Sequence, residues 1–184
     1  MIHKAPIEFS RTVTLDEAAR QREPMTIRAS ADERAALARR FGLISLDALA
    51  ATLAFKVSGD TAMVHGQLSA TLAQACSATG EPIAVALDEP FVLQFEPEPL
   101  NEIPDAPDED WEIELDASDC DVMHYERDNI DLGEAVAQTL LLSLDPYPRI
   151  ANADSFLVAK GVKSEEEAGP FGALAALKDK LGKS

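Results

Sequence analysis

The pattern of apolar and polar positions in the first half of the chain predicts a helix over residues 30–42. Ser30 and Glu33 have the spacing of a capping box, in which each side chain accepts a hydrogen bond from a backbone N–H group at a helix start. Leu37 and Phe41 follow at helical spacing, and a glycine then stands where many helices end. We therefore expect Leu37 and Phe41 to be buried against a sheet.

Alternating apolar and polar residues predict strands on both sides of this helix. The alternation is weak over residues 6–14 and clearer over residues 25–29. From residue 43 to residue 95 it continues, with an alanine-rich stretch that we also interpret as strand. These segments predict an antiparallel meander.

Glycine and proline divide the meander. Turns are predicted at residues 58–60 and 77–82, where such residues cluster. Two further alternating stretches, residues 83–87 and 91–95, stand on either side of Pro90. We expect them to be separate strands, because proline lacks the N–H group that a sheet ladder uses.

A second helix is predicted over residues 131–144. Asp131 is its expected cap and Glu134 stands three residues on. The apolar residues that follow at helical spacing, and that we expect to be buried, are Val136, Leu140 and Leu144.

The segment before this helix is acidic and rich in proline. Four prolines fall within residues 96–110, which predicts an acidic loop there. The next five residues alternate apolar and acidic side chains from Trp111 to Leu115, as a short edge strand does. We expect Trp111 to anchor the loop on the core.

The C-terminal residues 151–184 have few apolar positions at first, which predicts a flexible tail. Apolar side chains then recur at helical spacing and predict a short amphipathic helix over residues 171–181; they are Phe171, Leu174, Leu177 and Leu181. Docking of this helix on the protein's own sheet and docking on a partner both remain open.

Together these elements predict an α+β fold. We expect a curved antiparallel sheet of five or six strands with two helices packed on it, as one domain over residues 1–150. Residues 151–184 form the tail. The chain has 184 residues, which is enough for one such domain with an extension.

The net charge and its distribution limit the classes of function that the protein can have. The formal net charge is −17, which argues against a general nucleic-acid-binding surface and favours basic partners. Residues 57–126 carry 17 carboxylates and no lysine or arginine. The longest uncharged stretch, residues 61–80, is too polar to span a membrane, and the N-terminus has no secretory pattern. We therefore expect a cytoplasmic protein, in which Cys76 and Cys120 are free thiols.

The sequence lacks the common catalytic motifs, such as a nucleophile elbow or a phosphate-binding loop. One alternative is a metal-dependent hydrolase that would use an acidic cluster with one histidine: Asp116, Asp119, Asp121 and His124. Another is an acidic nucleic-acid mimic. We favour a protein without enzymatic activity and without a cofactor.

Four stretches together resemble one family, and in order and spacing they cover nearly the whole chain: residues 30–41, 66–82, 130–149 and 170–178. The most specific is Asp131-Leu132-Gly133-Glu134, followed by Leu144-Asp145-Pro146-Tyr147-Pro148-Arg149. They resemble the bacterial YceD family, the large-subunit ribosomal RNA accumulation proteins, in its alphaproteobacterial form.

The resemblance implies a non-enzymatic ribosome biogenesis factor, which we expect to bind a basic ribosomal protein or a preribosomal particle. Basic patches would allow RNA contact as well. The residues that we predict to bind the partner are Arg34, Arg39, Arg40, Arg149, Phe171, Leu174, Leu177 and Lys178.

The chain departs from cysteine-rich members of this family. Those members place a second cysteine a few residues after the one that matches Cys76, and add a cluster beyond the second helix. Here Ser77, Ala78 and Thr79 follow Cys76, and residues 146–154 contain no cysteine. We therefore expect no structural zinc.

Overall fold

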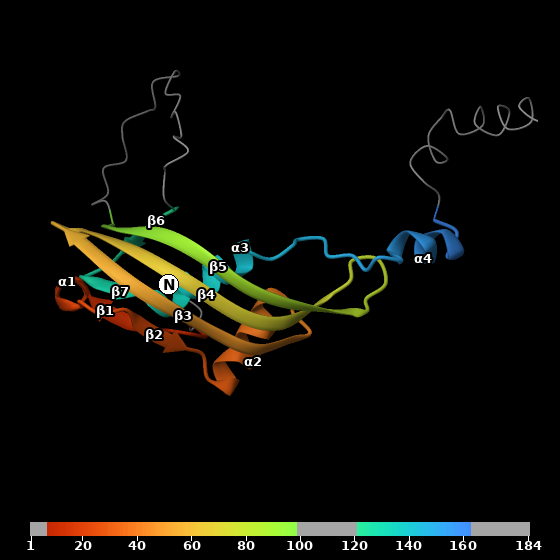
Figure 1. The fold of residues 1–184 in the computed structure, drawn as a ribbon, viewed down its shortest axis with the longest axis horizontal. Helices are drawn as coiled ribbons and strands as arrows, with labels where there is room; N and C mark the ends of the chain where they lie inside the picture. Colours follow the sequence, from red (N-terminus) through yellow and green to blue (C-terminus); the bar gives the residue numbers. More distant parts are fainter. Residues whose placement is uncertain (1–6, 99–120, 163–184) are drawn as a thin grey trace, which may run out of the picture. The chain divides into compact units, whose positions relative to one another are not determined.

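The computed structural model describes residues 7–98 and 121–162 (Figure 1). The chain divides into two compact units. The first comprises Met1–Ala73 and Ala84–Leu144, and the second comprises Gln74–Ile83 and Asp145–Ser184. Within the described ranges, no helix is long and apolar enough to cross a membrane.

The fold is mixed α+β, as predicted, and its largest sheet has five strands in the order β2-β3-β4-β5-β6. The strands are β2 (Met25–Arg28), β3 (Ser45–Ser58), β4 (Thr61–Ala75), β5 (Pro82–Pro97) and β6 (Asp121–Tyr125). The pairs β2–β3 and β3–β4 are antiparallel, whereas β6 runs parallel to β5. The predicted meander is therefore confirmed for these antiparallel strands, and the parallel strand was not expected.

Strand β5 corrects the sequence analysis. It is one strand through Pro90, where two strands were predicted, and it includes Glu96 and Pro97, which were assigned to the loop. Strand β6 pairs with β5 only from Leu93 onward. Among the described residues, β5 therefore has no strand beside Pro90 on that side, and an edge position tolerates a residue without an N–H group.

The N-terminal segment also differs from the prediction. The strand expected over residues 6–14 is only β1 (Thr12–Thr14), which pairs with β7 (Asn129–Asp131). An unpredicted helix, α1 (Leu15–Arg20), follows directly. Thr14 and Glu17 form a capping box at its start, so the local hydrogen bonds end the strand there.

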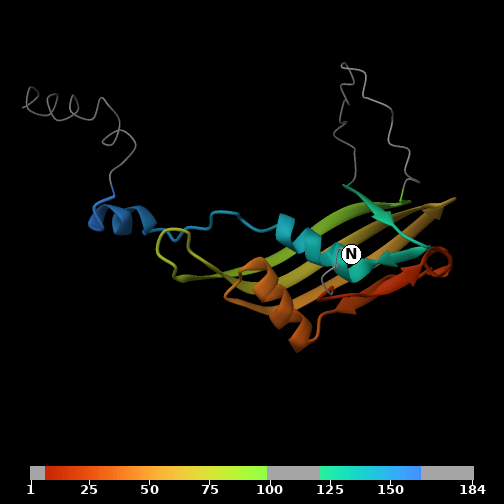
Figure 2. The same ribbon diagram turned by 180° about the vertical axis from the view of Figure 1, so that it is seen from behind.

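Both predicted helices are confirmed, as α2 (Ala31–Phe41) and α3 (Leu132–Leu142). Figure 2 shows that they cover the same face of the large sheet. Their buried side chains meet the inward side chains of β3 and β4 in one core; the fully buried ones include Leu37, Leu53, Val64, Leu68, Val136 and Leu140. Phe41 and Leu144 are only half-buried, and both pack against this core.

Gly66 in β4 leaves room for the ring of Phe91 in β5. A Cβ atom at Gly66 would overlap the far end of that ring. The ring therefore fills the space that a side chain on β4 would need, as aromatic residues do beside glycine in sheets.

The second unit contains an unpredicted helix, α4 (Ala153–Ala159), within the range assigned to the tail. Gly80, in the turn between β4 and β5, has a φ of 76°, which favours glycine. The side-chain amide of Gln74 donates to the carbonyl of Asp145 at 3.0 Å, and the N–H of Ser77 donates to the carbonyl of Pro148. The predicted edge strand at 111–115 and the predicted helix at 171–181 lie outside the described residues.

Candidate functional site

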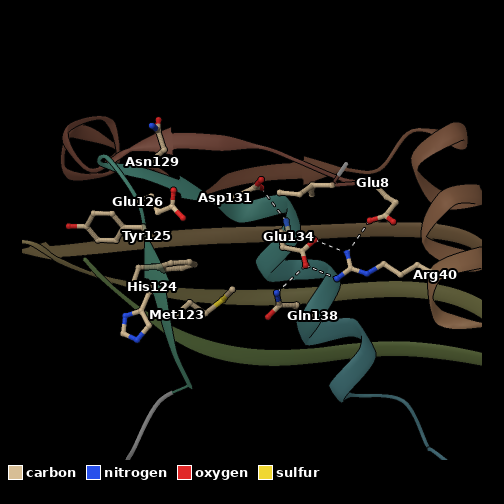
Figure 3. Close-up of a pocket in the computed structure, with 12 residues that line it drawn as sticks. Glu8, Arg40, Met123, His124, Tyr125, Glu126, Asn129, Asp131, Glu134 and Gln138 are labelled. Carbon is tan, nitrogen blue, oxygen red and sulfur yellow. Dashed lines mark hydrogen bonds and ion pairs between the residues drawn. The ribbon is translucent and has the colours of Figure 1, made fainter. Parts of the chain in front are cut away.

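The candidate site is a cavity of about 700 Å³ in the first unit (Figure 3). Its walls come from the N-terminal segment, the end of α2, strands β5, β6 and β7, and α3. Eight of its twelve lining residues are polar or charged. Their positions follow from the way these segments are held together.

Asp131 fixes the N-terminal segment to the start of α3. Its carboxylate accepts hydrogen bonds from the N–H groups of Gly133 and Glu134 at 3.0 and 3.2 Å, which caps the helix. The same carboxylate accepts from the Ser10 hydroxyl at 2.6 Å and from the N–H of Arg11 at 3.0 Å. One side chain thus joins residues that are more than 100 positions apart.

The glycine after this cap allows close packing. A Cβ atom at Gly133 would lie 2.6 Å from the carbonyl oxygen of Phe9 and 2.8 Å from the nitrogen of Arg11. Any other residue would therefore displace the N-terminal backbone from α3. This contact explains the glycine within Asp131-Leu132-Gly133-Glu134.

Arg40, in the last turn of α2, lies at the centre of an ion-pair network. Its guanidinium donates to both carboxylate oxygens of Glu134, at 2.8 and 2.7 Å, and to Glu8 at 3.1 Å. Hydrogen bonding to Glu134 raises the pKa of Arg40 above its usual value. Gln138 donates to Glu134 from one helical turn further along α3, at 3.0 Å (Figure 3). The pair holds the two helices together at one side of the cavity.

The opposite side is a tight hairpin between β6 and β7. Arg127 and Asp128 have φ values of 51° and 62°, as in the two-residue turns that connect the strands of a hairpin. Tyr125, just before the turn, is buried, and its hydroxyl donates to the carbonyl of Asp60 at 2.6 Å. The hairpin brings Glu126 and Asn129 to the cavity.

The cavity is therefore acidic. Four carboxylates line it, namely Glu8, Glu126, Asp131 and Glu134, against the single guanidinium of Arg40. Arg40 is already paired with two of them. Such a cavity attracts ammonium and guanidinium groups and repels phosphate. In the part of the chain that the structure describes, no group of three or more His, Cys, Asp or Glu side chains could hold a metal ion.

The four predicted arginines have different surroundings. Arg34 donates to the carbonyl of Ala29 at 2.7 Å and, with the exposed Arg39, lines a separate cavity of about 440 Å³. Arg40 belongs to the network described above. Arg149 pairs with Asp154 at 3.1 Å in the second unit. Partner binding by these arginines stays a prediction, and Phe171, Leu174, Leu177 and Lys178 lie outside the described residues.

Only some of the other candidate residues lie within the described ranges. Asp121 and His124 stand on β6, and His124 lines the acidic cavity. Asp116 and Asp119 of the predicted hydrolase cluster lie outside the described residues, as do Trp111 and Cys120. Cys76 is a buried free thiol, as predicted for it.

Glu8, Glu126 and Glu134 were not predicted as site residues. Glu134 was identified only as part of a helix start, and Glu8 and Glu126 had no signal of their own. Arg40 and Glu134 are separated by 94 positions, so no local pattern shows that they meet. The acidic composition is the one sequence property that pointed toward such a site.

Comparison with known proteins agrees with the resemblance noted from the sequence. The family described as large ribosomal RNA subunit accumulation protein YceD matches residues 64–178, more than half of the chain. No curated protein and no solved structure matches. The matched range includes β5, the β6–β7 hairpin and α3, and so most of the walls of the acidic cavity. The chain belongs to the YceD family of large ribosomal RNA subunit accumulation proteins.

Proposed function

We propose that this protein supports accumulation of large-subunit ribosomal RNA as a cytoplasmic, non-enzymatic assembly factor. In this role it holds a basic segment of a ribosomal protein or of a preribosomal particle. The family assignment supports the biological role. The acidic cavity supports the mode of action, because lysine and arginine side chains are its natural ligands.

Four carboxylates and only one arginine line the same cavity, and this observation is the main support for the proposal. A protein of net charge −17 repels bare RNA over most of its surface. Ribosomal proteins carry the opposite charge, since they neutralise RNA phosphates. Electrostatic attraction would speed their encounter with this protein and weaken as salt increases.

Direct binding tests the mode of action. Purified large-subunit ribosomal proteins and a large-subunit RNA transcript would be titrated separately against the full-length protein at two salt concentrations. We expect at least one ribosomal protein to bind, more weakly at the higher salt concentration. Tight binding of the bare transcript, with no ribosomal protein bound, would contradict the proposal.

Depletion tests the biological role. A strain that loses the protein should have a lower ratio of large-subunit to small-subunit RNA, and a plasmid copy should restore it. An unchanged ratio under growth-limiting conditions would count against a role in RNA accumulation.

A further inference from the structure

A second cavity, of about 280 Å³, adjoins the acidic cavity along α3. Met123 and Gln138 line both cavities, so the two lie side by side, and together they are called here the α3 groove. Six of the ten residues that line the second cavity are apolar, and Asp121 contributes one carboxylate. Two of its side chains, Val122 and Leu142, are 50% and 76% exposed and so are accessible to a partner.

The two walls of the α3 groove change character in the same direction. On α3, Glu134, Gln138 and Leu142 are four residues apart and therefore share one face of the helix. This stripe passes from a carboxylate, through an amide, to an exposed leucine. On the other wall, Val122 of β6 lies at the apolar end, and Glu126, the residue that follows β6, lies at the acidic end.

The lengths of the walls also agree. Eight residues of helix from Glu134 to Leu142 span about 12 Å, at about 1.5 Å per residue. Four steps of extended chain from Val122 in β6 to Glu126 just after it span about 13 Å, at about 3.3 Å per residue. The acidic and apolar ends are thus separated by about the distance between residues i and i+4 of an extended peptide, whose side chains point the same way.

We propose that the α3 groove binds an extended polypeptide segment with a lysine or arginine at one position and a large apolar residue four positions away. The basic side chain enters the acidic end, beside Glu126, and the apolar side chain packs on Val122 and Leu142. This inference rests on the proposed function and narrows it, because it replaces general charge attraction with a sequence requirement on the partner.

Charge complementarity selects this occupant over two others. A nucleic acid would bring phosphates to the carboxylates of the acidic end, which is unfavourable. A second copy of this chain would bring another net charge of −17 to the same place. A basic segment with an apolar residue satisfies both ends of the α3 groove.

The test uses full-length protein and an array of overlapping 15-residue peptides that cover the large-subunit ribosomal proteins of the source organism. Peptides that bind would be remade and measured in solution by fluorescence anisotropy.

The variant Leu142→Ser removes the exposed apolar side chain, and Leu141→Ser is its matched control. Leu141 is on the same helix and 47% exposed but lines neither cavity. The pair Glu126→Gln and Glu89→Gln tests the acidic end in the same way, since Glu89 is exposed on β5 and lines neither cavity.

We expect bound peptides to share a basic residue and an apolar residue four positions apart. Leu142→Ser should weaken binding about tenfold, the loss expected for one leucine contact, and Leu141→Ser should change it less than twofold. Replacing the apolar residue of the peptide by alanine should weaken its binding to the wild-type protein. The same replacement should have little effect on its binding to the Leu142→Ser variant. Equal effects of the two serine variants, or no bound peptide, would overturn the inference.

Further outcomes distinguish a failure of this inference from a failure of the proposed function on which it rests. If sedimentation shows that the wild type is a dimer and Leu142→Ser is a monomer, a second copy of this chain occupies the α3 groove, and the inference is overturned. If depletion lowers the large-subunit RNA while Leu142→Ser binds peptides as the wild type does, the inference fails and the proposed function stands. If depletion leaves the RNA ratio unchanged, the proposed function itself fails.

Discussion

Arg40 and Glu134 form a bidentate ion pair, with nitrogen–oxygen distances of 2.8 and 2.7 Å, that joins the last turn of α2 to the first turn of α3. The Arg40 side chain is 34% exposed and that of Glu134 only 16%. A charge-assisted pair of this geometry is stronger than an ordinary surface salt bridge. Both residues also line the acidic cavity, so the pair forms part of one of its walls.

The first prediction concerns this pair. Arg40→Gln should lower the free energy of unfolding by about 1–2 kcal/mol, because it removes several hydrogen bonds to charged groups. Arg39→Gln is the control: it changes an exposed neighbour and should have an effect within about 0.5 kcal/mol. Urea denaturation measures both. Equal stability of the two variants would show that Arg40 is not a structural residue.

The second prediction concerns Gly66 and the ring of Phe91. Gly66→Ala should destabilise the protein by about 1–3 kcal/mol, because the added methyl group overlaps the ring and forces it to move. In a Phe91→Ala background the same change should cost much less. Thermal unfolding of the four proteins gives the coupling between the two residues. The same cost in both backgrounds would contradict the contact.

The third prediction is a pH dependence. Glu33 accepts two hydrogen bonds from the guanidinium of Arg11, at 2.7 and 2.9 Å, and this interaction lowers the pKa of Glu33 from 4.5 to about 2. Because the folded pKa lies below the unfolded one, the pair stabilises the fold fully above about pH 4.5, and this contribution is lost as the pH falls toward 2.

Glu33→Gln removes the carboxylate that titrates. The difference in unfolding free energy between wild type and variant should therefore be largest above pH 5 and shrink toward about pH 2. Glu89→Gln serves as the control for a carboxylate elsewhere on the surface. A wild-type advantage that stays constant from pH 6 to about pH 2 would exclude this linkage.

The fourth prediction concerns Cys76 and Thr79 in the second unit. A hydrogen bond from the Thr79 side chain, with further ones from backbone groups of Ile150, Ala78 and Thr79, lowers the pKa of the buried Cys76 thiol from 9.0 to about 7. Thr79→Val should raise that pKa, because it removes the largest contribution. Ultraviolet titration of the thiolate in a Cys120→Ser background measures it, with Thr71→Val as control. An unchanged pKa in Thr79→Val would exclude the hydroxyl as its cause.

The sequence predicted those parts of the fold that depend on neighbouring residues. Ser30 and Glu33 mark the start of α2 because both groups of a capping box are local. Thr14 and Glu17 carry the same signal, but α1 has only six residues and one buried side chain, so no apolar periodicity follows the cap. Alternation also predicted β3 and β4, whose inward side chains form the core.

The remainder depends on contacts between distant residues. The parallel pairing of β6 with β5 brings Asp121 beside Leu93, and no local pattern encodes that neighbour. The same holds for the acidic cavity, whose residues come from both ends of the first unit. Arg40 was predicted as a partner contact from its charge alone. Its pairing with Glu8 and Glu134 required the tertiary structure.

We propose that this protein supports large-subunit RNA accumulation through the α3 groove. This proposal is tested most directly by the ratio of large-subunit to small-subunit RNA in a depleted strain that carries one plasmid copy of the gene. The groove variant combines Glu126→Gln with Leu142→Ser, and the control variant combines Glu89→Gln with Leu141→Ser. We predict that wild type and control restore the ratio and that the groove variant, present at the same level, does not. Full restoration by the groove variant would contradict the account.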